Sequence, residues 1–214
     1  MKNFLIFLTT VITLLIIVGC SNNEALTDSK TKNEIQTTEK KGDNLEVFYQ
    51  MNNMVGRKDE YYSKNILIDS NYYKSNPFNR GDVIYFNVPN DLEKIESIKK
   101  QITRVVALEG EKVTIKKGQV YINDMKLDSF YGQLRAGGMN EEEFFSKEID
   151  ACKEEVCKDG YREFFSTYVK DLVIPKGSIF VISDNSTRGY DSLTFGPLPV
   201  DQVIGRVLGY KKEK

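Results

Sequence analysis

The sequence has 214 residues, a formal net charge of −1 and no histidine. The lack of histidine excludes Ser-His-Asp and Cys-His catalysis and histidine-ligated zinc, and it removes the usual general base at neutral pH. Acidic and basic residues are mixed along the chain, so no nucleic-acid partner is expected. A hydrolase built from this chain needs another base, and lysine is the obvious candidate.

The first residues have the pattern of a bacterial export signal. Lys2 gives a short positive start, and an uncharged apolar run follows over residues 4–18. The run is shorter than the ~20 residues that a spanning helix needs, so residues 1–19 are predicted to be a cleaved signal peptide. It ends in Ile17-Val18-Gly19-Cys20, which resembles the lipobox of bacterial lipoproteins.

This resemblance implies that Cys20 is diacylated and becomes the new N-terminus. The chain is therefore expected on the outer face of the bacterial cytoplasmic membrane, with the membrane as a partner through its lipid anchor. An uncleaved anchor or a simple secretory signal is the alternative. In either case the remaining chain is exported.

Residues 20–43 are polar, charged and nearly free of large apolar side chains. Such a segment cannot bury enough surface to offset its chain entropy, so a flexible tether is predicted. Residues 44–214 are enough for one domain with a real core.

Segments rich in Val, Ile, Tyr and Phe and bounded by turn residues predict a mainly β domain. Lys116-Lys117-Gly118 separates two of them and predicts a short hairpin, because the glycine allows a positive φ. The predicted strands are 65–69, 82–87, 101–108, 112–115, 119–122 and 178–182.

One stretch, about 132–170, predicts a helical insert in this β domain. Asn140 followed by three glutamates has the pattern of a capping box, with Asn140 as N-cap and Glu143 at N3. Phe144, Phe145, Ile149 and Cys152 then recur at helical spacing, which favours a small cap with a core of its own.

Cys152 and Cys157 are the two cysteines left after Cys20, and an even number in an oxidising compartment predicts a disulfide. In one continuous helix their Cα atoms would lie about 8.5 Å apart, given the rise and rotation per residue. That exceeds the ~7 Å limit for a disulfide. The helix that starts after Asn140 is therefore expected to end before Cys157.

Three segments, in order along the chain, resemble the sequence boxes of type I signal peptidases. They are 78–86 (Phe-Asn-Arg-Gly-Asp-Val-Ile-Tyr-Phe), 103–111 (Thr-Arg-Val-Val-Ala-Leu-Glu-Gly-Glu) and 183–205, which contains Phe-Gly-Pro-Leu-Pro. Together they cover most of residues 65–210. The resemblance implies a signal-peptidase-like antiparallel β scaffold, with the insert as a small helical cap.

That family cleaves exported preproteins with a Ser-Lys dyad, in which a desolvated lysine takes the proton from a serine hydroxyl. Matched residue by residue, the nucleophile position is Asn53, the lysine position Thr103, and the serine that orients the lysine Gly189. Asparagine has no hydroxyl, and threonine accepts no proton near pH 7. The resemblance therefore implies an intact scaffold around a catalytic site that has lost its dyad.

A divergent but active enzyme is the alternative. Ser63 would then be the nucleophile and Lys99 or Lys100 the base. Lys99 shares a strand face with Thr103 but lies about 13 Å from it along the strand, too far to replace a lysine there without a bulge.

The other charged residues that match the boxes are interpreted as structural: Arg80, Asp82, Arg104, Asp184 and Asp191. Arg104 and Asp184 match charged family positions, so we expect them to pair across the former active site. Residues 184–189 faintly resemble a calcium loop, but Arg188 holds a ligand position and Phe195 stands where the bidentate glutamate belongs. No metal and no cofactor are expected.

The preferred interpretation is a catalytically inactive, signal-peptidase-like lipoprotein that binds extended peptide segments, or an active signal peptidase, at the membrane surface. In the family, substrate binds by strand addition, which does not require the dyad. An active serine endopeptidase that cleaves exported preproteins is the first alternative. A lipid-tethered structural domain without peptide binding is the second.

Overall fold

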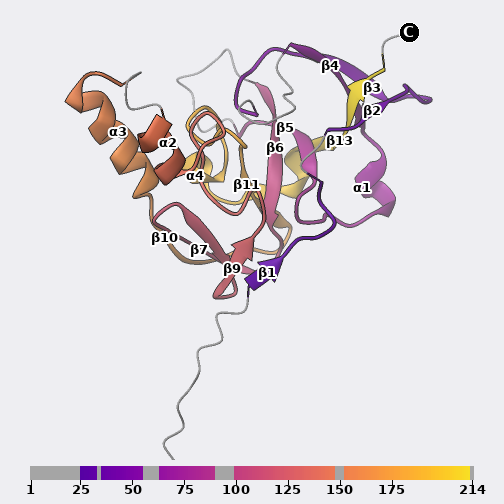
Figure 1. The fold of residues 1–214 in the computed structure, drawn as a ribbon. Helices are drawn as coiled ribbons and strands as arrows, with labels where there is room; N and C mark the ends of the chain where they lie inside the picture. The colour runs from indigo at the N-terminus through magenta and orange to yellow at the C-terminus, as the bar shows by residue number, and fades with distance from the viewer. Residues whose placement is uncertain (1–24, 33–34, 55–62, 90–98, 148–151, 213–214) are drawn as a thin grey trace, which may run out of the picture.

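The computed structural model describes residues 25–32, 35–54, 63–89, 99–147 and 152–212. Two β-sheets with few helices make up the fold (Figure 1), and the predicted mainly β class is confirmed. The predicted signal peptide, the predicted lipidation site Cys20, and Ile149 lie outside the described residues. Within them, no helix has the length and apolar character needed to cross a bilayer.

The larger sheet carries most of the core, and its interior strand β6 is buried on both faces. On one face Ile102 packs with Ile66 and Val83, and on the other Val105 packs with Ile84 and Val181. In sheet order the strands are β12 (Leu198–Pro199), β11 (Ser178–Ile182), β6 (Lys100–Ala107), β5 (Val83–Asn87), β13 (Val203–Lys211), β4 (Lys64–Asp69) and β3 (Leu45–Tyr49), with β2 (Thr37–Thr38) added to β13.

The smaller sheet contains the predicted hairpin. Lys117 and Gly118 have φ angles of 49° and 69°, as a two-residue type I′ turn requires. Phe180 and Ile182 of the larger sheet pack against its inner face, so the two sheets share one core. Its order is β1 (Ala25–Thr27), β9 (Met125–Asp128), β8 (Gln119–Ile122), β7 (Lys112–Lys116) and β10 (Val169–Val173).

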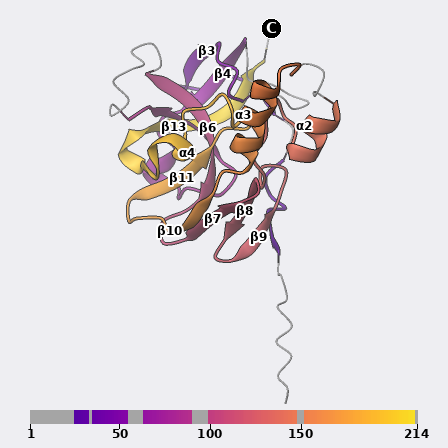
Figure 2. The same cartoon turned by 90° about the vertical axis from the view of Figure 1, so that its left-hand side faces the viewer.

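Two helices of the insert, α2 (Glu141–Lys147) and α3 (Glu155–Phe165), lie together at one side of the molecule (Figures 1 and 2). The capping box is confirmed: Asn140 Oδ1 accepts from Glu143 N–H at 2.9 Å, and Glu143 Oε2 accepts from Asn140 N–H at 3.1 Å. Phe144 and Phe165 form a separate small core between the helices. The remaining helices are the single turns α1 (Tyr72–Ser75), α4 (Ser192–Phe195) and η1 (Val200–Gln202).

Cys152 and Cys157 are joined by a disulfide, with Cα atoms 5.7 Å apart. α2 ends at Lys147, well before Cys157, as predicted. The second helix α3 was not predicted, and Cys157 lies in its first turn. The bridge therefore fixes the entry of α3 to the chain just before it.

The described part of residues 20–43 differs from the predicted flexible tether. β1 pairs in parallel with β9, and β2 pairs in parallel with β13. Leu26 packs against the core of the smaller sheet and Ile35 against that of the larger one. The few apolar side chains of this polar stretch pack against the cores of the two sheets, and this burial offsets the conformational entropy lost when the segment becomes ordered. We call residues 25–32 and 35–38 the strap.

Candidate functional site

The candidate site lies where β11 leaves β6. β11 pairs with β6 as far as Ile182, and the chain then leaves the sheet as the loop 183–191. Backbone groups of successive strand residues point to alternate sides. The N–H and carbonyl of Val105 form hydrogen bonds with Asp82 and Gly81, on the β5 side of β6. Ile102 lies three residues earlier, so its N–H and carbonyl point to the other side of β6, where β11 no longer pairs.

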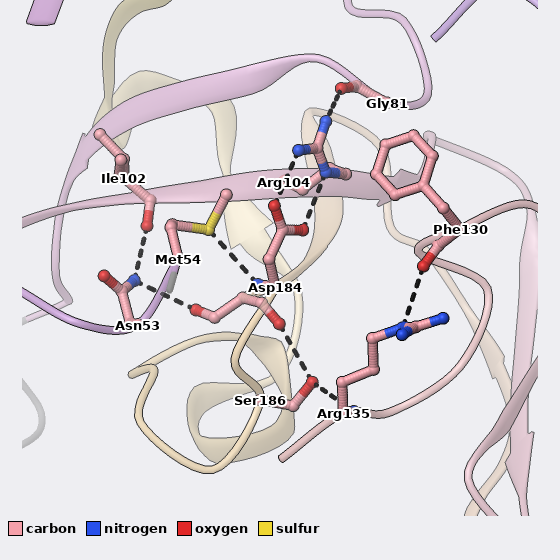
Figure 3. Close-up of polar contacts among 10 residues, drawn as sticks. Asn53, Met54, Gly81, Ile102, Arg104, Phe130, Arg135, Asp184 and Ser186 are labelled. Carbon is pink, nitrogen blue, oxygen red and sulfur yellow. Dashed lines mark hydrogen bonds and ion pairs between the residues drawn. The ribbon is translucent and has the colours of Figure 1, made fainter. Parts of the chain in front are cut away.

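Two side chains take both backbone groups of Ile102. Its N–H donates to the Tyr49 hydroxyl at 3.1 Å. Its carbonyl accepts from Asn53 Nδ2 at 2.7 Å, as Figure 3 shows. The Tyr49 hydroxyl donates in turn to Asn53 Oδ1 at 2.6 Å, and burial raises the pKa of Tyr49, which keeps this donor protonated. The edge of β6 is therefore closed at this point by the protein's own side chains.

Asn53 is fully buried, and its whole amide takes part in structural contacts. Besides Ile102, its Nδ2 lies 3.3 Å from Ser183 Oγ and 3.4 Å from Gln101 Oε1. Its backbone carbonyl accepts from Asn185 N–H at 2.8 Å. Asn53 thus ties its own segment to both β6 and the loop 183–191. We call Tyr49, Asn53 and Ser183 the plug.

Thr103 is also fully buried, but on the opposite face of β6 from Ile102. It stands opposite Ile84 of β5, whose side chain belongs to the apolar cluster on that face. Its hydroxyl and Gln101 Nε2 have no hydrogen-bond partner in the described part of the chain. Position 103 therefore offers an uncharged, unpaired group and no base.

Gly189 has no room for a side chain. A Cβ built there would lie 1.9 Å from Ser183 Oγ and 2.4 Å from Ser183 Cβ. Both contacts are far below any normal approach, so Ser183 occupies the space that a side chain at position 189 would need. The two positions are sterically coupled.

Arg104 and Asp184 form the predicted pair. Arg104 Nε and Nη2 donate to the two Asp184 oxygens at 2.9 and 2.8 Å, and both side chains are almost fully buried (Figure 3). Arg104 Nη1 also donates to Gly81 O at 2.7 Å. The guanidinium lies 5.0 Å from the ring centre of Phe130 and 5.5 Å from that of Tyr131. This bidentate pair fixes the start of the loop 183–191 to β6.

Asn185 links the insert to the plug. Its side-chain amide donates to Asn52 O at 3.2 Å, and its Oδ1 accepts from Gly137 N–H at 3.0 Å. Next to it, Ser186 N–H donates to Arg135 O at 2.8 Å. The base of the insert therefore rests on the loop that carries the candidate site.

Arg80 and Asp82, which were interpreted as structural from the sequence, make contacts that join separate elements. Arg80 bonds to Val106 O and pairs with Glu111 at 2.6 Å, which joins the entry of β5 to the β6–β7 turn. Asp82 accepts from Tyr73 OH at 3.1 Å and lies 3.0 Å from Arg206, in an ion pair whose geometry is not that of a hydrogen bond.

Asp191 is a buried carboxylate at the other end of the loop. It accepts from Ser183 N–H at 2.7 Å and from Leu193 N–H at 3.0 Å, where it caps α4. Burial raises its pKa to about 6, although the hydrogen bonds from Ser183 and Leu193 act in the opposite direction. The carboxylate holds the two ends of the loop together.

Ser63 and Lys100 are far apart. Lys64, next to Ser63, begins β4 at the end of β13 that contains Lys211. Lys100 stands opposite Asn87, at the other end of β13, and β5 and β13 lie between β4 and β6. Lys99 lies at the same end, where its carbonyl accepts from Val88 N–H at 3.0 Å. Neither form of the alternative dyad is therefore assembled in this structure.

The chain matches the family model described as "Signal peptidase, peptidase S26" over residues 49–210, a range that includes every position of the site. The chain belongs to the signal peptidase S26 family. Its polar plug, ion pair and loop 183–191 are parts of a signal peptidase I-like domain.

Several signal peptidases are similar to the chain. Signal peptidase I of Bacillus caldolyticus is 27% identical over 146 residues, 66% of each chain, and signal peptidase IB of Staphylococcus aureus 26% over 139 residues, 63% of this chain and 61% of that one. Thylakoidal processing peptidase 1 of Arabidopsis thaliana is 28% identical over 105 residues, 49% of this chain. The chain spans between 22% and 66% of the length of these relatives.

Among solved structures, signal peptidase I from Enterococcus faecalis V583 aligns with a TM-score of 0.40 and 24% sequence identity. The alignment covers 61% of this chain and 97% of that one.

Asn53, at the position that the family resemblance assigns to the nucleophile, contacts residues next to the other two assigned positions, while the Thr103 side chain lies on the opposite face of β6 from Ile102. Asn53 contacts the backbone next to Thr103, and Ser183 contacts both Asn53 and the space beside Gly189. In this chain the three positions hold the Asn53 amide, the Thr103 hydroxyl, which has no partner among the described residues, and Gly189, which has no side chain. Such a set can hold structure together, but it contains no serine-lysine pair.

Four residues of the site had no role in the sequence prediction: Tyr49, Gln101, Ser183 and Asn185. Ser183 and Asn185 flank Asp184 within the third box, so their place in the site was readable from the resemblance. Tyr49 lies four residues before Asn53 and Gln101 two before Thr103, and nothing in the sequence joins those pairs. Only the folded sheet brings them together.

Proposed function

We propose that this chain is a catalytically inactive, signal peptidase I-like lipoprotein on the outer face of the membrane, where it binds extended peptide segments without cleaving them. The observation that carries the proposal is the buried amide of Asn53. At the nucleophile position stands a group that accepts from Tyr49 and donates to Ile102, and no hydroxyl is available there.

The other candidate groups for peptide hydrolysis also support inactivity. Thr103 cannot serve as a base, and the chain has no histidine. Ser183 contacts Asn53 but is 1% exposed, and no hydrogen bond in the described part of the chain brings a lysine to it. A nucleophile without an adjacent base is weak at neutral pH.

The peptide-binding part of the proposal depends on a free strand edge. At Ile102 the edge of β6 is already taken by Tyr49 and Asn53, so an added strand must pair elsewhere. β3 pairs with β4 on one side, and among the described strands it has no partner on the other. It exposes Phe48 (54%) and Leu45 (40%), which suits an apolar extended segment.

Binding is tested with a fluorescent signal peptide titrated against the soluble domain from residue 25. We expect saturable binding that Phe48→Asp weakens severalfold. Val156→Asp is the matched control, because Val156 is an exposed apolar residue (74%) on α3, away from β3. No binding by the wild type would favour a purely structural, lipid-tethered domain. Equal losses of affinity in both variants would show that the peptide does not bind at β3.

Cleavage is tested with a preprotein substrate, and the wild type should leave it intact. Asn53→Ser with Thr103→Lys supplies both dyad members but leaves Gly189 unable to orient the new lysine. Adding Gly189→Ser requires Ser183→Gly at the same time, because the two side chains cannot coexist. Among these variants we expect activity only in the one that carries all four substitutions. Cleavage by the wild type that Ser63→Ala abolishes would establish the active enzyme instead.

A further inference from the structure

The strap is held to the domain along its whole described length. Asp28 accepts from Tyr131 OH and from the backbone N–H groups of Lys30 and Thr31. At Gly81, a Cβ would lie 1.9 Å from Thr31 Oγ1, so this glycine leaves the space that Thr31 fills.

Gly209 provides a second such place. A Cβ there would lie 2.0 Å from Gln36 O, which also accepts from Tyr210 N–H at 2.9 Å. Two glycines therefore leave space for the strap at two separate points. Side-chain contacts of Asp28 and Thr31, together with the backbone contact of Gln36, fix its course across the domain.

The strap enters the domain at one defined end. Ala25 stands opposite Lys126 on β9, beside the turn at Asn123 and Asp124 that closes the β8–β9 hairpin. Both views place β1 and β9 at the opposite end of the molecule from β3 and β4 (Figures 1 and 2). The strap therefore begins, at Ala25, at the hairpin end of the smaller sheet.

The chain between Cys20 and Ala25 spans at most about 18 Å when fully extended, at 3.3–3.6 Å per residue. We infer that the hairpin end of the smaller sheet faces the bilayer and touches its headgroup layer, so that β3 and β4 point away from the membrane. This inference rests on the proposed lipid anchor at Cys20. A flexible tether over 20–43 would have allowed every orientation, whereas the docked strap allows a narrow set.

The side chains at this end fit headgroups and not the hydrocarbon interior. Asn123, Asp124 and Lys126 are exposed and polar, and Lys112 pairs with Asp124 at 2.7 Å. Mixed charges of this kind are well solvated at a zwitterionic or anionic surface and costly below it. The partner is therefore the phospholipid headgroup layer, with the acyl chains of Cys20 as the inserted part.

The test uses the full lipidated protein, bound to vesicles of phosphatidylcholine and phosphatidylglycerol that contain some headgroup-quencher lipid. A dye is placed at Lys126→Cys on β9 or at Asn65→Cys on β4, both exposed strand positions. We expect severalfold stronger quenching at position 126 than at 65. In a control with a long Gly/Ser insertion after Ser21, the strap stays docked but the distance limit is lifted, so the difference should shrink.

Flotation of the protein with the vesicles separates the two proposals. Failure to float, with no labelled palmitate on the protein, would overturn the anchor and this inference with it. Flotation with equal or reversed quenching at the two positions would overturn the orientation alone and leave the anchor standing.

Discussion

Ser183 and Asp184 are neighbours in the loop 183–191, but they belong to two different parts of the site. Asp184 makes a buried, bidentate ion pair with Arg104, as the family boxes imply. Ser183, one residue earlier, contacts the Asn53 amide and fills the space beside Gly189. The ion pair holds the loop on β6, and this structural contact does not depend on whether the protein cleaves peptides. Retained box charges therefore indicate the fold, and only the dyad positions indicate the activity.

The largest effect is expected from breaking the ion pair. Asp184→Ala leaves the Arg104 guanidinium buried without its carboxylate, which should cost about 3–5 kcal/mol of unfolding free energy. Urea denaturation of the soluble domain measures it. Replacing both residues, as Arg104→Met with Asp184→Leu, should recover much of the loss, because no charge remains buried. A single variant as stable as the wild type would contradict a structural role for the pair.

A smaller loss is expected at the plug. Asn53→Ala leaves the Tyr49 hydroxyl and the Ile102 carbonyl without their partner, which should cost about 2–3 kcal/mol. Asn52→Ala is the matched control, since Asn52 is exposed and contributes only its backbone carbonyl to Asn185. Its change should stay within about 0.5 kcal/mol. Equal stability of the two variants in urea would show that the contacts of Asn53 in the plug do not stabilise the fold.

Asp191 should make stability depend on pH. Burial raises its pKa from 3.8 to about 6, so the folded protein takes up this proton at higher pH than the unfolded chain does. Its contribution to the unfolding free energy therefore increases as the pH falls from 6 toward 4, by at most about 1.4 kcal/mol per unit.

Asp191→Asn should remove this slope, and it should cost about 1–2 kcal/mol near pH 7 because its NH2 group faces a backbone N–H. Urea midpoints measured between pH 4 and 7 for both proteins provide the comparison. Identical pH profiles would show that Asp191 does not titrate in this range.

The smallest effect, and one of opposite sign, is expected at Thr103. Its buried hydroxyl has no partner among the described residues, so Thr103→Val removes an unsatisfied polar group. We expect a gain of up to about 1 kcal/mol by thermal or urea unfolding. Thr103→Ser keeps the hydroxyl and removes a methyl group, so it should destabilise. A loss in the valine variant would point to a hydrogen bond that Thr103 needs.

The predicted strands agree with the structure to within one residue at their ends, because each is a short apolar run that turn residues bound. Several strands were not predicted, and among them β13 and β10 were missed for different reasons. β13 contains two glycines and an arginine, and its alternation is interrupted by shifts in register. β10 is an exposed edge strand with Asp171 at a positive φ, so its sequence is more polar than that of a buried strand.

The site residues could be predicted where they lie within the family boxes. They could not be predicted where only the pairing of strands brings them into contact. Arg104 and Asp184 were paired in advance because both match charged box positions. Tyr49 and Gln101 reach Asn53 from separate strands, and the contact depends on how β11 diverges from β6. The strap escaped prediction for the same reason, since Leu26 and Ile35 are too few to indicate burial without their partners.

The strap also has a consequence for the order in which the parts of the chain fold. Thr37 pairs with Tyr210, so almost the whole domain separates these two residues in sequence. Closing such a long loop is entropically costly until the sheets between its ends have formed. The N-terminal strap is therefore expected to dock last, and hydrogen exchange during refolding should protect Tyr210 N–H later than the amides of β6.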